Sequence, residues 1–213
     1  MRSHVMPPPT HRELRKLVRK LGVAARPTEQ KNALATLAAL CCDPDNRVAI
    51  AAAGAIPDLV ALLGPPFQAA VQRDAAAALM DLSANNDANQ IAIAAAGAIP
   101  PLVRLLGRAS SAVVQFNAAG ALWDLSGNAD NQFTIVAAGA IPLLVQLLGP
   151  GTSVGVQHYA AGALTCLAAS AGNDVAIITA GAIPPLVQLL GGRDPSSGAA
   201  AGSRSINKYL WER

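Results

Sequence analysis

Aromatic residues are scarce in this sequence. Only seven of its 213 residues are Phe, Trp or Tyr, although hydrophobic residues of all kinds make up 52%. Any core must therefore be built from Leu, Ile, Val and Ala. A local concentration of aromatic side chains would stand out in such a chain as a candidate binding site.

Cysteine is also rare. There are three cysteines, an odd number, and Cys41 and Cys42 are adjacent. This is not the pattern of a disulfide framework, and reduced thiols predict an intracellular protein. The first ten residues lack the apolar stretch of a secretory signal, and Arg2 stands where N-myristoylation requires glycine. We expect the protein in the cytoplasm or the nucleus.

Long uninterrupted hydrophobic runs are missing as well. Each apolar run is broken by Gly and Pro near its middle. The runs therefore fall short of the roughly 18 residues that a membrane-spanning helix needs. We expect no helix of this chain to span a membrane.

Charge is concentrated at the two ends of the chain. Residues 1–31 carry eight Lys or Arg and two acidic residues, and residues 193–213 carry four and two. The stretch between them, 32–192, carries four Arg and nine Asp. The pI of about 9.0 therefore reflects the ends, and we expect no nucleic-acid partner.

The groups that catalysis requires do not come together in the sequence. Cys166 follows His158 by eight residues on one predicted helix, about 12 Å along its axis and too far for a nucleophile–base pair. Cys41 and Cys42 have no histidine at metal-ligand spacing. The phosphate-binding motifs G-x-x-x-x-G-K-[ST] and G-x-G-x-x-G are both absent from the sequence. We therefore expect no enzymatic activity, no cofactor and no metal.

The sequence does contain a repeated tetrapeptide, Gly-Ala-Ile-Pro. Its glycines lie 43, 42 and 42 residues apart. Each copy follows an Ala-rich segment and precedes the pattern Leu-Val-x-Leu-Leu-Gly, so the whole chain is organised as a structural repeat. The four glycines are Gly54, Gly97, Gly139 and Gly181.

Each repeat is predicted to hold a short, a medium and a long helix, for example Ile99–Leu106 for the medium and Ala112–Leu125 for the long one. An asparagine in register is predicted to cap the short helix. The repeated glycine is predicted to end the short helix in a left-handed conformation, and the proline to start the medium one. Thr28 is likewise expected to cap the first long helix, with Pro27 outside it. The four asparagines are Asn46, Asn89, Asn131 and Asn173.

The long repeated pattern resembles the armadillo repeat, especially in plant and vacuolar armadillo proteins. It runs N-x-x-x-I/V-x-x-A-G-A-I-P-x-L-V-x-L-L-G and then V-Q-x-x-A-A-x-A-L-x-x-L. The resemblance implies an all-α fold, a right-handed α-solenoid of three-helix repeats. It covers residues 12–192, about four repeats with the first and last incomplete, between a disordered segment 1–11 and a flexible tail 193–213.

The two ends of this array are atypical. Residues 12–21 form a basic helix with one apolar stripe, interpreted as an end cap, with membrane-surface binding or targeting as the alternative. After the last medium helix no long helix is predicted. Three explanations stay open: the tail folds back through Ile206, Leu210 and Trp211, the chain is cut from a longer array, or the uncapped end self-associates.

The resemblance further implies a concave groove lined by the long helices. Importin-like members hold an extended peptide with ladders of Asn and Trp. Here the Asn positions are Ala39, Asp81, Asp124 and Cys166. The Trp positions are Ala35, Ala77, Gly120 and Gly162. Both ladders are missing, so we do not expect binding of classical nuclear import signals.

The remaining candidates for partner binding lie on three long helices. Two carboxylates one repeat apart face the implied groove, and four aromatic or imidazole rings cluster on the third and fourth long helices. The alternative is that the rings pack between helices and the carboxylates are solvated. The candidate residues are Arg73, Asp81, Phe116, Trp123, Asp124, His158 and Tyr159.

These observations favour a non-catalytic scaffold or adaptor that binds an extended or helical segment of another protein. The partner segment is expected to carry apolar anchors and some positive charge. One alternative is the substrate-recognition part of a ubiquitin ligase. Another is a peripheral, membrane-associated armadillo protein of the vacuolar type, attached through the basic helix.

Overall fold

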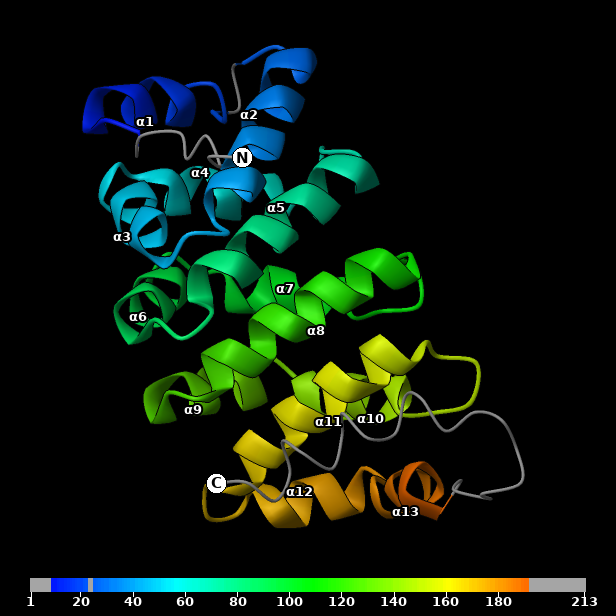
Figure 1. The fold of residues 1–213 in the computed structure, drawn as a ribbon. Helices are drawn as coiled ribbons and strands as arrows, with labels where there is room; N and C mark the ends of the chain where they lie inside the picture. Colours follow the sequence, from blue (N-terminus) through cyan, green and yellow to red (C-terminus); the bar gives the residue numbers. More distant parts are fainter. Residues whose placement is uncertain (1–8, 23–24, 192–213) are drawn as a thin grey trace, which may run out of the picture. The chain divides into compact units, whose positions relative to one another are not determined.

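The computed structural model describes residues 9–22 and 25–191, and these residues form thirteen helices and no strand (Figure 1). The prediction of an all-α fold is confirmed. Most of the predicted disordered segment 1–11 lies outside the described residues, as does the tail 193–213.

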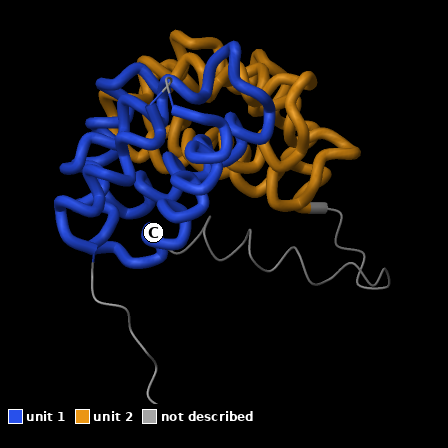
Figure 2. The backbone as a smooth tube through the Cα atoms, turned by 90° about the horizontal axis from the view of Figure 1, so that it is seen from above, with its two compact units in different colours: residues 1–98 blue, residues 99–213 orange. Residues whose placement is uncertain are grey.

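The chain divides into two compact units, residues 1–98 and 99–213 (Figure 2). The helices of the first unit are α1 (His11–Val18), α2 (Pro27–Leu40), α3 (Pro44–Ala52), α4 (Ala55–Leu62), α5 (Ala69–Ser83) and α6 (Asp87–Ala95). Those of the second are α7 (Ile99–Leu105), α8 (Ala112–Ser126), α9 (Ala129–Ala137), α10 (Ala140–Leu147), α11 (Val154–Ala168), α12 (Asn173–Thr179) and α13 (Ile183–Gly191).

The helices follow the predicted order of short, medium and long. In the first unit the long helix α5 packs against α2 and α4, and in the second unit α11 packs against α8 and α10. Leucines on the facing sides, such as Leu37, Leu59 and Leu79, are fully buried. Because aromatics are few, these aliphatic side chains carry most of the burial that stabilises each unit.

The repeated glycine has the predicted left-handed backbone. Its φ is between +78° and +89° in all four copies. Nothing lies within 4 Å of a Cβ built on any of them, so the backbone conformation, rather than packing, is what favours glycine. The medium helix begins at Ile99 in the second copy, as predicted, and one or two residues before the proline in every copy. In α4, for example, the start at Ala55 places Pro57 within the first turn.

The repeated asparagine does not cap the short helix, which corrects the prediction. The caps of α3, α6, α9 and α12 are Asp43, Asn86, Asn128 and Gly172. The predicted asparagines lie inside the helices, where each donates its side-chain N–H to a carbonyl at the end of the preceding long helix. These bonds are Asn46 to Leu40 (3.2 Å), Asn89 to Leu82 (2.8 Å), Asn131 to Leu125 (3.1 Å) and Asn173 to Leu167 (3.0 Å).

In α6 and α9 the glutamine after the asparagine bonds the next carbonyl of the same long helix. Gln90 Nε2 donates to the Ser83 carbonyl at 3.1 Å, and Gln132 Nε2 donates to the Ser126 carbonyl at 2.8 Å. The last carbonyls of a helix have no partner within it. Side-chain amides of the following short helix therefore satisfy them and join successive helices.

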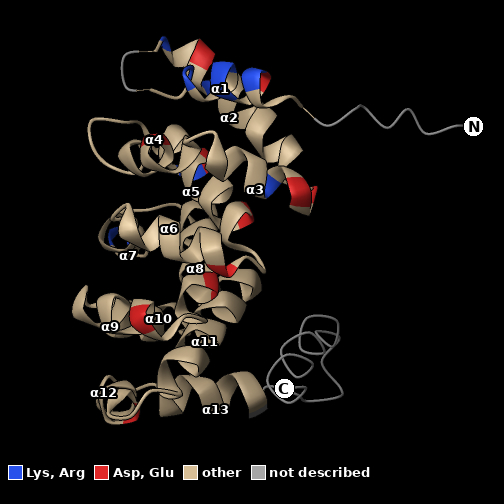
Figure 3. Ribbon diagram, turned by 90° about the vertical axis from the view of Figure 1, so that its left-hand side faces the viewer, with Lys and Arg blue, Asp and Glu red and all other residues tan. Residues whose placement is uncertain are grey.

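The basic helix α1 turns its apolar stripe inward. Leu14 and Val18 are buried, and so is Leu21 just beyond the helix, whereas its Lys and Arg residues are exposed. Figure 3 marks the positions of these basic residues in blue. Thr10 and Glu13 form a capping box at its start. A buried apolar stripe with a polar outer face is what an end cap requires.

The start of α2 also differs from the prediction. Pro27 is its first residue, and Arg26, not Thr28, is its N-cap. The fixed φ of proline suits the first helical position, and its missing N–H is lost there without cost.

No single helix in the described residues is long and apolar enough to cross a membrane. The pair α12 and α13 passes that test of length and composition together, but it is bent by 82°.

Candidate partner-binding site

Four rings cluster between α8 and α11 in the second unit. Phe116 and Tyr159 lie edge to face with centroids 4.7 Å apart, and Trp123 and His158 lie edge to face at 5.3 Å. Tyr159 is 5.6 Å from both Trp123 and His158. Edge-to-face pairs at these distances are favourable beyond the area they bury, so the rings form one connected aromatic cluster.

Two glycines on α11 make room for the rings of α8. A Cβ on Gly155 would lie 2.8 Å from Phe116 Cε2, and a Cβ on Gly162 would lie 2.7 Å from Trp123 Cε2. Phe116 and Trp123 are seven residues apart on α8, and Gly155 and Gly162 are seven residues apart on α11. Seven residues make two helical turns, so each ring meets one glycine. The rings of α8 therefore pack directly on the backbone of α11.

All four rings remain partly exposed. Phe116, Trp123, His158 and Tyr159 are each half-buried. Burial lowers the pKa of His158, so its imidazole is neutral at pH 7. The aromatic cluster thus packs between the two helices, as one of the two interpretations of the sequence expected, and leaves part of its surface accessible.

Asp124 follows Trp123 on α8 and is also half-buried.

In the first unit, Asp81 lies near the end of α5 in a partly buried polar environment. Burial raises the pKa of its carboxyl group, and the Arg47 guanidinium opposes that rise. Arg47 itself donates to the carbonyls of Cys41 at 2.7 Å and Ala84 at 2.9 Å, at the ends of α2 and α5. A cation at two helix C-termini is favourably placed.

The buried thiol of Cys41 is part of the same environment. Burial and the nearby Asp81 raise its pKa to about 12, so it stays protonated at neutral pH. A protonated, buried thiol is a poor nucleophile.

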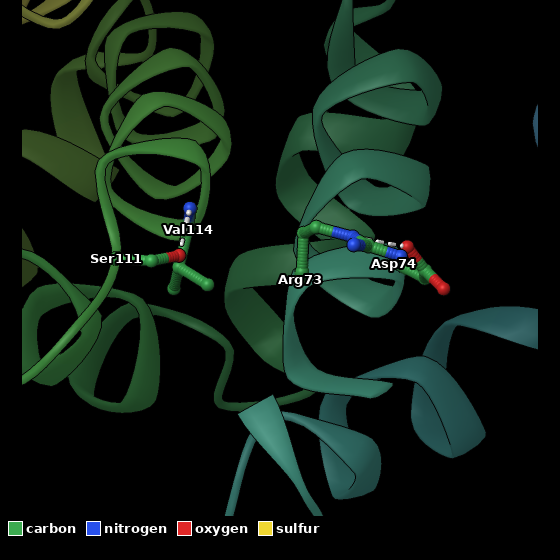
Figure 4. A network of polar contacts seen from close by, with 4 residues as sticks. All are labelled: Arg73, Asp74, Ser111 and Val114. Carbon is green, nitrogen blue, oxygen red and sulfur yellow. Dashed lines mark hydrogen bonds and ion pairs between the residues drawn. The ribbon is translucent and has the colours of Figure 1, made fainter. Parts of the chain in front are cut away.

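Arg73 lies two turns before Asp81 on α5. Its Nε forms an ion pair with the Asp74 carboxylate (Figure 4), and the two atoms are 2.7 Å apart. The two side chains are 44% and 29% exposed. This ion pair offsets its positive charge within the helix.

The structure thus places the seven candidate residues on α5, α8 and α11, within their own units. It brings four of them into ring contact, and whether any of the seven binds a partner stays a prediction. Arg47 was missed by sequence reasoning, although it occupies the register of Gln90 and Gln132. Within the described residues, no three His, Cys, Asp or Glu side chains could hold a metal ion together.

Comparison with known proteins identifies the repeat. The model of the Armadillo/beta-catenin-like repeat matches residues 86–127 and 128–169. No curated protein matches the sequence significantly.

Solved structures match nearly the whole chain. A computationally designed armadillo repeat protein for modular peptide recognition is 30% identical, with 91% of this chain and 79% of that chain covered and a TM-score of 0.79. An engineered protein from a structural genomics consortium is 32% identical over 91% of this chain and 75% of that one, with a TM-score of 0.78.

A designed armadillo repeat protein in complex with the peptide (KR)4 is 28% identical. The match covers 91% of this chain and 78% of the designed protein, with a TM-score of 0.78. The repeated helix triplets, the family match and these likenesses lead to one conclusion: the chain belongs to the armadillo repeat family and has its all-α solenoid fold.

Proposed function

We propose that this chain is a non-catalytic scaffold that binds an extended or helical segment of another protein on its long helices. The observation that carries this proposal is its likeness to designed armadillo repeat proteins made for peptide recognition, one of them in complex with (KR)4. Fold alone does not name a partner, so the ligand class is argued from the candidate residues.

The charge on the long helices supports a basic partner segment. Asp81 and Asp124 are 43 residues apart, one repeat, and both are half-buried near the ends of their helices. Half-buried carboxylates interact with a cation more strongly than fully solvated ones. We expect each to pair with a Lys or Arg of the partner.

The aromatic cluster supports apolar anchors in the same segment. Partly exposed aromatic side chains are enriched among residues that dominate binding energy. In this chain they are concentrated on α8 and α11, beside Asp124. The favoured ligand therefore alternates basic with apolar or aromatic residues.

The test is fluorescence anisotropy of the full chain with three labelled peptides: (KR)4, a peptide that alternates Lys with Leu and Trp, and (DE)4. We expect the Lys–Leu–Trp peptide to bind most tightly and (DE)4 not to bind. Asp81→Lys and Asp124→Lys should each weaken binding by at least about tenfold, because each places a positive charge against a basic residue of the peptide.

The matched controls are Asp87→Lys and Asp130→Lys, which make the same charge change at exposed positions of α6 and α9, also one repeat apart. These variants should bind like the wild type. Equal binding of all four variants, or equal binding of acidic and basic peptides, contradicts the proposed site.

We also propose a cytoplasmic or nuclear location, which rests on the three unpaired cysteines. Imaging of the tagged full chain in cells tests this location. Fluorescence in the vacuole, or tagged protein secreted into the medium, would contradict it. The ubiquitin-ligase and vacuolar alternatives have no observation of their own in their favour.

A further inference from the structure

The last two helices expose an apolar face. Large aliphatic side chains on α12 and α13 are half or more exposed, although most such side chains are buried elsewhere in the same unit. They are Val175 (64%), Ile178 (56%), Ile183 (51%), Val187 (59%) and Leu190 (50%). Val175 resembles its counterpart Phe133 on α9, which is 80% exposed, so the unusual exposure is that of α13.

The preceding repeat shows how much of this exposure is unusual. Its medium helix α10 has the same sequence pattern 42 residues earlier. There Ile141 is 4% exposed, Val145 9% and Leu148 2%, because α11 packs over the helix. The equivalent residues of α13 are exposed by half or more, so no long helix among the described residues covers this face as α11 covers its counterpart.

Beyond α13 the sequence continues with a polar linker and then a short apolar segment. Residues 192–205 are rich in Gly, Ser and Ala, and they lead to Ile206-Asn207-Lys208-Tyr209-Leu210-Trp211. Ile206, Tyr209 and Leu210 have the i, i+3, i+4 spacing of one helical face. The segment therefore holds the apolar side chains that a covering helix needs.

We propose that residues 206–211 dock on the exposed face of α12 and α13 in the same chain and take the place of the missing long helix. This proposal is independent of peptide binding on the long helices. It commits to a segment of this chain rather than to a second copy, because of how the two ends are joined.

The linker length supports docking within one chain. Fourteen residues of Gly/Ser-rich composition span roughly 20 Å on average, whereas α13, with nine residues, is about 13 Å long. The segment can therefore reach the whole face. Such a tether gives an effective concentration on the order of millimolar, far above the micromolar concentrations at which a second copy would compete.

Hydrogen–deuterium exchange on the full chain tests the proposal. Leu210→Asp places a charge in the apolar segment, and Asn207→Asp adds the same charge outside its apolar set. We expect the amides of α13 in the wild type and Asn207→Asp to exchange at least about tenfold more slowly than in Leu210→Asp. Exchange in α8 should be the same in all three, which shows that the variants are folded.

Protein concentration provides a second readout. The slow exchange of α13 should not change between low and high micromolar protein, and light scattering should show a monomer.

Three results would each overturn the proposal. The first is equal α13 exchange in the wild type and Leu210→Asp. The second is protection that grows with protein concentration together with a dimer mass, which assigns the face to a second copy. The third is flotation of the wild type with phosphatidylcholine vesicles. Binding of α12 and α13 to the vesicles would assign the exposed face to lipid.

Discussion

Trp123 occupies the space that a side chain at position 162 would need. A Cβ on Gly162 would lie 2.7 Å from Trp123 Cε2 and 2.8 Å from Cδ2. In importin-like armadillo repeats, the position of Gly162 holds a tryptophan of the peptide-binding ladder. In this chain the indole instead comes from the preceding long helix and is packed against the backbone of α11.

The first prediction rests on this contact. Gly162→Ala should destabilise the protein by about 1–3 kcal/mol, the usual range for overpacking, although alanine is the better helix former. The free energy of unfolding from urea denaturation measures it.

The Trp123→Ala background provides the control. Without the indole, the same Gly162→Ala change should stabilise the helix by up to about 1 kcal/mol. A substitution that is destabilising to the same extent in both backgrounds contradicts the contact, because a double-mutant cycle would then show no coupling.

The second prediction concerns the repeated corner. Gly97 has φ +80° and no atom within 4 Å of a built Cβ. Gly97→Ala should therefore cost about 1–2 kcal/mol through backbone strain alone. Gly97→Asn should cost less, since asparagine tolerates this conformation. Equal costs in thermal unfolding would point to packing instead.

The third prediction separates the two roles considered for the repeated asparagine. Asn89→Asp keeps a side chain that can cap a helix but loses the N–H that bonds the Leu82 carbonyl. Asn89 is 4% exposed, so the loss should destabilise the chain by about 1–3 kcal/mol.

Asn32→Asp, at an exposed position of α2, is the matched control and should change the free energy of unfolding by no more than about 0.5 kcal/mol. If Asn89→Asp is as mild as the control, a capping role is favoured over the bond to the long helix.

The fourth prediction is a pH dependence from His158. Burial lowers the pKa of its imidazole below the usual 6.5. The folded chain therefore binds fewer protons than the unfolded chain just below that pH, and stability falls as the pH falls through this window. His158→Gln removes the titrating group. The wild type should lose more stability than the variant between about pH 7.5 and pH 5.

Urea denaturation at several pH values, with His11→Gln as an exposed control on α1, measures this difference. Parallel pH profiles for the wild type and His158→Gln would show that burial does not shift the imidazole.

Much of the fold was predictable from local pattern. The left-handed glycine of each corner, the order of helices and the long helix from Ala112 were predicted because backbone conformation and helical periodicity are encoded within a few residues. The clustering of Phe116, Trp123, His158 and Tyr159 was also anticipated, since the repeat register places them on neighbouring helices.

The sequence by itself therefore determined the repeat, the helix triplets and the family resemblance. Only the tertiary structure decided what the side chains contact. It showed that Asn89 bonds the end of α5, that Arg47 joins two helix ends, and that Gly162 accommodates Trp123. The physical reason is that these contacts join residues of different helices, and one sequence carries the spacing of its own helices but not the side-chain geometry between them.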